Sequence, residues 1–163
     1  MVELHASRSK GISNALLERL CKRLCSKDFK GVFAANKIPR LLAGVSNFSI
    51  IVNLGEVDGS DAEIPVGHFV CINGNAERIL YIDPYGLPCM QPKVLEFLLL
   101  SRRPLMENRR QIQHFDSPYC GLYSVLFVVY FDKEASDWMK MKFNKKELWG
   151  NDKKCVGYLK RLL

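Results

Sequence analysis

One cysteine in this sequence lies where a thiol is most readily made into a nucleophile. Cys120 follows a Pro-Tyr turn and precedes Gly121, at the start of an apolar segment that we expect to be a buried helix. The dipole and the unpaired N–H groups of a helix N-terminus favour a thiolate, which is the nucleophilic form of cysteine. By contrast, Cys71 lies mid-strand among apolar neighbours, Cys89 lies on a loop, and Cys155 lies near the C-terminus. Position therefore selects Cys120 as the candidate nucleophile.

A thiol nucleophile needs a base, and the base needs a group that orients its ring. His68 lies early in one predicted strand, and Asp83 ends the next strand, after a Gly74-Asn75 turn. Antiparallel pairing across this turn brings the Asp83 carboxylate within reach of the His68 ring. A cysteine, histidine and aspartate triad is therefore available, in the chain order His, Asp, Cys. The alternative is that His68, beside a phenylalanine in a strand, is purely structural.

Two groups near Cys120 could stabilise the oxyanion of a tetrahedral intermediate. One is the backbone N–H of Cys120 itself, and the other is the side-chain amide of Gln113, seven residues upstream. The competing histidine, His114, is only six residues from Cys120, and we expect it at the rim of the site.

The elements that must position these residues follow from periodicity and turn signals. We expect an amphipathic helix at 14–25, a second at 91–101 and another in the tail, with a loop and short helix at 29–46. The segment 119–132 is apolar all round, as expected of a central buried helix. The predicted fold is α+β: one domain over 1–163, with a small mixed or antiparallel sheet packed on that helix. Its strands are expected at 47–54, 66–73, 77–83 and 110–115, the last after a basic connector at 102–110.

Composition narrows the class of protein. The 163 residues are 48% hydrophobic and 25% charged, which is typical of a folded protein rather than a disordered one. We find no apolar run of membrane-spanning length and no signal peptide, so we expect an intracellular, non-secreted protein whose six cysteines are reduced. No metal site is expected, because CxxC pairs and zinc-finger spacing are absent; Cys21 and Cys25 belong to an apolar helix stripe.

Positive charge is concentrated in a basic tail, residues 138–163. The chain carries net charge +7, and this tail holds eight basic and two acidic residues. Aromatic residues interleave with the lysines, as on a surface that contacts phosphates, although a solvated helix face is an equal interpretation. The candidate DNA contacts are Lys140, Lys142, Lys145, Lys146, Lys153 and Lys154.

The candidate residues lie in motifs that, over residues 14–133, resemble the adenovirus-type cysteine endopeptidases, the adenain family. That family belongs with the ubiquitin-like-protein (SUMO) proteases in one clan with His–acid–Cys order and an α+β fold. The motifs are Gly67-His68-Phe69, the turn Tyr81-Ile82-Asp83-Pro84-Tyr85-Gly86, and Gln113 seven residues before Cys120-Gly121-Leu122-Tyr123, with Phe29–Phe33 and Ile51-Val52-Asn53 upstream.

The resemblance implies Cys120 as nucleophile, His68 as base and then acid, Asp83 as the group orienting His68, and Gln113 in the oxyanion hole. Adenovirus enzymes usually carry Glu at the acid position, whereas Asp is common elsewhere in the clan. The resemblance further implies a monomeric endopeptidase of a related DNA virus or virus-like transposon. Such an enzyme would process capsid precursors after a small residue such as glycine, in the host nucleus or the virion.

The sequence requires no cofactor, although the resemblance implies DNA as a candidate activator. The family's disulfide-linked activating peptide is not expected here, because no cysteine lies between Met90 and Tyr119; Cys89 is the nearest substitute. Three alternatives stay open. They are an isopeptidase that removes ubiquitin-like modifiers, an acetyltransferase built on the same triad, and a basic DNA-binding module without catalysis. The isopeptidase branch usually places its Gln six residues before the Cys, where this chain has His114.

Overall fold

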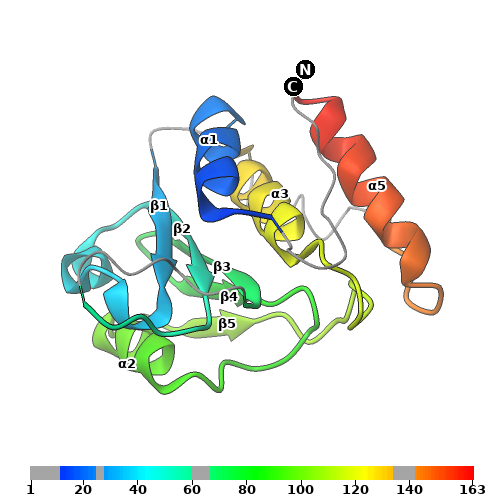
Figure 1. Ribbon diagram of the computed structural model, residues 1–163. Helices are drawn as coiled ribbons and strands as arrows, with labels where there is room; N and C mark the ends of the chain where they lie inside the picture. The colour runs from blue at the N-terminus through cyan, green and yellow to red at the C-terminus, as the bar shows by residue number, and fades with distance from the viewer. Residues whose placement is uncertain (1–11, 25–27, 60–66, 134–141) are drawn as a thin grey trace.

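The computed structural model describes residues 12–24, 28–59, 67–133 and 142–163 (Figure 1). The strands form a five-stranded mixed sheet in the order β1-β2-β3-β4-β5, in which the outer pairs are parallel and the inner pairs antiparallel. The strands are β1 (Phe29–Ala34), β2 (Phe48–Asn53), β3 (Phe69–Gly74), β4 (Ile79–Ile82) and β5 (Leu105–Glu107). The helices are α1 (Asn14–Leu24), α2 (Pro92–Leu100), α3 (Cys120–Lys133) and α5 (Trp149–Lys160), with short 3-10 helices η1 (Ala35–Lys37) and η2 (Arg40–Gly44).

Helices cover both faces of the sheet. Helices α1, α3 and α5 lie over one face, and α2 with the two 3-10 helices lies over the other (Figure 1). Every residue of the central strands β2 and β3 is buried, because both faces of these strands are covered. The α+β fold class predicted from the sequence is confirmed, as are the strands predicted near 47–54, 66–73 and 77–83.

Helix α3 is the central helix that the sequence predicts. It packs on β2 and β3 and also against α1 and α5, so that residues 120–129 are all buried. Burial on every side explains why its sequence is apolar all round instead of showing one apolar stripe. Cys120 is its first residue.

The β3–β4 hairpin carries the candidate base and acid at one end. Its antiparallel register pairs Cys71 with Ile82 and Gly74 with Ile79. His68 precedes β3 and Asp83 follows β4, so the pairing places both residues at the same edge of the sheet, beside the N-terminus of α3.

The segment 29–46 differs from the expected loop and short helix, because its first six residues form strand β1. The reason is Gly31, which has φ +139° and lies at a register shift in the pairing of β1 with β2. A glycine in this conformation allows a bulge that other residues rarely adopt. The bulge interrupts the period-two pattern by which a strand is recognised.

The strand predicted at 110–115 is wrong, and the strand in this region is β5, which lies within the supposed basic connector. The N–H groups of Ile112 and Gln113 both donate to the Pro84 carbonyl, at 3.0 and 3.1 Å. Backbone donors used in this way cannot form a strand ladder, so residues 110–115 are an irregular segment joined to the end of β4.

Candidate active site

The candidate active site is centred on a short hydrogen bond between the side chains of His68 and Asp83, which are largely shielded from solvent. His68 Nε2 lies 2.7 Å from Asp83 Oδ1, and the Asp83 side chain is only 2% exposed. The Tyr85 N–H donates to the same oxygen at 2.7 Å, and the Tyr85 ring stacks on the His68 ring with centroids 4.1 Å apart. The carboxylate and the tyrosine together fix both the position and the plane of the imidazole.

Cys120 interacts with the same imidazole. Burial lowers the pKa of His68, but the hydrogen bond to Asp83 and the negative charges of Asp83 and Cys120 outweigh burial and raise this pKa from 6.5 to about 9. The ring is therefore protonated at neutral pH. Its other nitrogen, Nδ1, is buried and makes no hydrogen bond of standard geometry within the described part of the chain.

The other described thiols lie in environments that oppose ionisation or access. Burial raises the pKa of Cys89 to about 11, and it raises the pKa of Cys155 well above its ordinary value. Cys71 is fully buried in β3, as the sequence predicts, and Cys21 is fully buried in α1. Cys25 lies outside the described residues.

The backbone of Asp83 is held by one buried side chain, that of Asn108. Asn108 Oδ1 accepts from the Asp83 N–H, and Asn108 Nδ2 donates to the Asp83 carbonyl, both at 2.7 Å. These two hydrogen bonds join the end of β4 to the segment after β5. They fix the peptide from which the carboxylate projects.

The turn that contains Asp83 is packed directly against the segment that contains Gln113. Gly86, at φ +71°, lies so close to this segment that a Cβ there would stand 2.6 Å from the Arg110 carbonyl carbon. The Pro84 carbonyl accepts from the Gln113 N–H. The acid and the candidate oxyanion donor therefore belong to one backbone-bonded unit.

Gln113 is fully buried near the head of α3. Its Nε2 donates to the carbonyl of Ser117, three residues before Cys120, at 2.7 Å. Its Oε1 is buried without a hydrogen-bond partner among the described residues. The structure thus brings together His68, Asp83, Gln113 and Cys120, the four predicted site residues.

Helix α5 contacts this unit directly, which the sequence did not indicate. Asn151 Nδ2 donates to the Ile112 carbonyl at 2.8 Å. Asp152 Oδ1 accepts from Ser117 Oγ and from Tyr123 Oη, each at 3.0 Å. Burial raises the pKa of the Asp152 carboxyl, and these two hydrogen bonds partly offset that effect.

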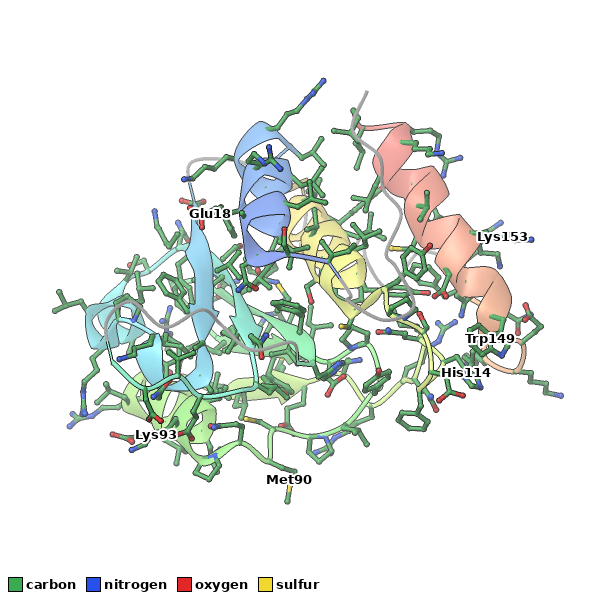
Figure 2. The ribbon with its side chains drawn as sticks, in the orientation of Figure 1. Glu18, Met90, Lys93, His114, Trp149 and Lys153 are labelled. Carbon is green, nitrogen blue, oxygen red and sulfur yellow. The ribbon has the colours of Figure 1, made fainter. Side chains whose placement is uncertain are left out.

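Five of the six candidate DNA-contacting lysines are exposed on α5 and the segment before it, while Lys140 lies outside the described residues. Lys153 points away from the rest of the molecule, whereas Trp149 lies beside His114 (Figure 2). The His114 and Trp149 rings stack with centroids 4.2 Å apart. The exposed lysines are Lys142, Lys145, Lys146, Lys153 and Lys154.

The sequence analysis assigned no role to four residues of the site. Tyr85 lies in the turn motif, and its place could have been found, because the β3–β4 register continued by three residues sets Tyr85 opposite His68. Asn108, Ser117 and Asp152 act through contacts between segments far apart in the chain, and no local pattern marks them. Among the described residues, no group of three His, Cys, Asp or Glu side chains could hold a metal ion, and no helix is long and apolar enough to cross a membrane.

Comparison with known proteins gives a likeness in structure only. No protein-family model matches the sequence. No curated protein matches it. Solved structures do match, among them AvrA delL154 with IP6 and CoA, with a TM-score of 0.45 and 16% identity. That match covers 78% of this chain and 50% of the other, so this chain spans about half the length of the structure it matches.

Proposed function

We propose that this chain is a cysteine endopeptidase. The observation that carries the proposal is the pair of His68 and Asp83, 2.7 Å apart, with Cys120 acting on the same imidazole from the head of a buried helix. A nucleophile, a base and a group that orients the base are the parts that thiol hydrolysis requires. The motif resemblance to the adenain family supports the same assignment.

In this proposal the Cys120 sulfur attacks the carbonyl carbon of a peptide bond. Charge develops on the carbonyl oxygen, which the Cys120 N–H and the Gln113 amide stabilise. The protonated His68 gives its proton to the leaving amine, and a thioester remains on the sulfur. A water molecule, deprotonated by the now neutral His68, then attacks the thioester, and the free acid leaves as the Cys120 thiolate re-forms beside the protonated His68.

The substrate class rests on the resemblance alone. We propose precursor proteins of a DNA virus or virus-like element, cleaved after a small residue such as glycine during maturation in the host nucleus or the virion. The resemblance also makes DNA a candidate activator, and the lysines on and before α5 are exposed, as a DNA contact requires.

Cleavage of a diverse peptide library tests the proposal whatever the natural substrate is. Proteome-derived peptides with blocked amino groups are incubated with the full chain, with and without duplex DNA, and new N-termini are identified by mass spectrometry. We expect termini that share a motif with a small residue before the cut. Activity only with DNA would identify DNA as the activator.

Two matched variants complete this experiment. Cys120→Ala should abolish the new termini, whereas Cys71→Ala alters a buried thiol of the sheet and should keep them. Retained cleavage by Cys120→Ala, or none by the unaltered chain in both DNA arms, would refute the proposal.

An isopeptidase acting on ubiquitin-like modifiers is the alternative within the same chemistry. Ubiquitin-like proteins that carry a C-terminal vinyl electrophile distinguish it. Rapid labelling at Cys120 by such a probe would favour the isopeptidase over the endopeptidase.

A further inference from the structure

Asp152 joins α5 to the segment just before Cys120. Its Oδ1 accepts from Ser117 Oγ at 3.0 Å and from Tyr123 Oη at 3.0 Å. Tyr123 lies one turn after Cys120 on α3, so the carboxylate bonds residues on both sides of the candidate nucleophile. The mechanism proposed above uses none of these three side chains.

The hydrogen bond to Asp152 determines where the Ser117 hydroxyl is a donor and where it is an acceptor. A hydroxyl has one proton, and here that proton is donated to the carboxylate. Its lone pairs then face the N–H groups around it, which are Gln113 Nε2 and the Tyr119 N–H, both at 3.3 Å. Ser117 Oγ therefore acts as an acceptor toward the candidate oxyanion donor and toward the residue that precedes Cys120.

The carbonyl of Ser117 fixes the orientation of the Gln113 amide. It lies 2.7 Å from Nε2, and in the flipped amide Oε1 would take that position and face another oxygen. One N–H of the amide is bound by this carbonyl. The second N–H contacts Ser117 Oγ at 3.3 Å, and this longer bond is the one for which an oxyanion would compete.

We propose that Asp152 and Ser117 are positioning residues that hold the two donors of the oxyanion hole, the Gln113 amide and the Cys120 N–H. Asp152 fixes Ser117, and Ser117 fixes the Gln113 amide and the backbone at Tyr119. This inference rests on the proposed function, and it makes α5 a structural part of the active site.

Two reactions of Cys120 separate this role from a general effect on folding. Acylation by p-nitrophenyl acetate forms a bond from sulfur to the acetyl carbon and places the carbonyl electron pair on oxygen. The carbonyl then re-forms as p-nitrophenolate leaves. Alkylation by iodoacetamide displaces iodide from carbon and forms no oxyanion, so only acylation needs the oxyanion hole.

The experiment measures the ratio of the acylation rate to the alkylation rate at Cys120 in the full chain. We expect Asp152→Ala and Ser117→Ala to lower this ratio by about 10-fold or more, since loss of a single oxyanion donor costs roughly 100-fold. Asp152→Asn keeps an oxygen acceptor at Oδ1 and should restore most of the ratio. That rescue would not be expected if only the bulk of the side chain mattered.

Leu159→Ala is the matched control on the same helix. Leu159 is fully buried on α5 but is not part of the hydrogen-bonded group, so this variant should lower stability and leave the ratio unchanged. An unchanged ratio in Asp152→Ala, or an equal fall in Leu159→Ala, would overturn the inference while leaving the proposed function intact. A Cys120 that is not acylated in the unaltered chain would overturn the proposed function as well.

Discussion

His68 keeps its proton at neutral pH because its partners offset the cost of burying a charged ring. Burial lowers its pKa, and the hydrogen bond to Asp83 together with the charges of Asp83 and Cys120 raises it more, to about 9. A histidine held in this state has the proton that the leaving amine of a peptide needs. Peptide cleavage should therefore fall as the pH rises through about 9.

The raised pKa of His68 also predicts that the free energy of unfolding depends on pH. Below pH 6.5, the ordinary pKa, His68 is protonated in the folded and the unfolded chain, so its stabilising effect is fully present. As the pH rises through about 9 the folded chain loses that proton, and the effect is lost. We expect urea titrations to show the free energy of unfolding fall over this range by a few kcal/mol more in the unaltered chain than in His68→Gln.

His114→Gln is the control for this prediction, because His114 stacks on Trp149 and its carboxylate neighbour is Asp116, whereas the partner of His68 is Asp83. It should show the same fall in stability as the unaltered chain. If His68→Gln also shows that fall, another group is responsible for it.

At the scale of elements, the end of the β3–β4 hairpin holds the acid by contacts with the chain beyond β5. Asn108→Ala would leave the buried Asp83 N–H without its partner, at a cost of about 1–3 kcal/mol. Cleavage per folded molecule should also fall, since the peptide that carries the carboxylate is no longer fixed. Chemical denaturation and the cleavage rate measure the two effects separately.

Asn36 offers a matched control for Asn108. Its side chain makes the same pair of hydrogen bonds to the backbone of Val57: Nδ2 donates to the Val57 carbonyl at 2.8 Å, and Oδ1 accepts from the Val57 N–H at 3.1 Å. This pair lies beside the other face of the sheet. Asn36→Ala should lower stability without lowering cleavage per folded molecule. Equal loss of cleavage in both variants would show that Asn108 has no particular effect on the site.

The close approach at Gly86 supports a second prediction at this scale. Gly86→Ala meets two costs: a positive φ and a Cβ 2.6 Å from backbone atoms of the Gln113 segment. Gly59→Ala has only the first cost, because its φ is +76° and no atom of the described residues lies within 4 Å of the added Cβ. We expect about 1–2 kcal/mol of destabilisation at Gly59 and clearly more at Gly86, measured by urea titration. Equal costs would contradict the close packing of the turn against this segment.

The sequence predicted the elements whose signals are local. The apolar run of α3, the stripe of α1 and the Gly74-Asn75 turn each depend on neighbours in the chain, and the elements they predict bring Cys120, His68 and Asp83 together. Strand β1 was not predicted, because the bulge at Gly31 interrupts the alternation of buried and exposed residues by which a strand is recognised. The contacts of Asn108 and Asp152 were not predictable, because each joins residues 25 to 35 positions apart.

At the scale of the whole molecule, the positive charge lies on a helix that is also part of the core. Cys155 and Leu159 of α5 are fully buried in the core cluster that contains α3, and the lysines before and after them on the helix, Lys153, Lys154 and Lys160, are exposed. Any phosphate bound by these lysines would thus be held on a rigid element next to the candidate active site. This arrangement gives the proposed DNA contact a defined place on the molecule.

The salt dependence of DNA binding tests this proposal. Replacing Lys153 and Lys154 by Gln should weaken binding to arbitrary duplex DNA and lower the slope of log affinity against log salt by about one per lysine. The pair Lys37→Gln and Lys93→Gln, on the opposite side of the sheet, should leave both unchanged. Binding that does not respond to salt in the unaltered chain would contradict a phosphate-contacting helix.

The measurement that tests the central claim most directly is the site of acylation. The full chain is exposed briefly to p-nitrophenyl acetate at neutral pH, quenched with acid and mapped by mass spectrometry. We predict an acetyl group on Cys120, formed about 100-fold more slowly in His68→Ala and at an unchanged rate in His114→Ala. An acetyl group on another residue, or equal rates in His68→Ala and the unaltered chain, would contradict a nucleophile assisted by His68.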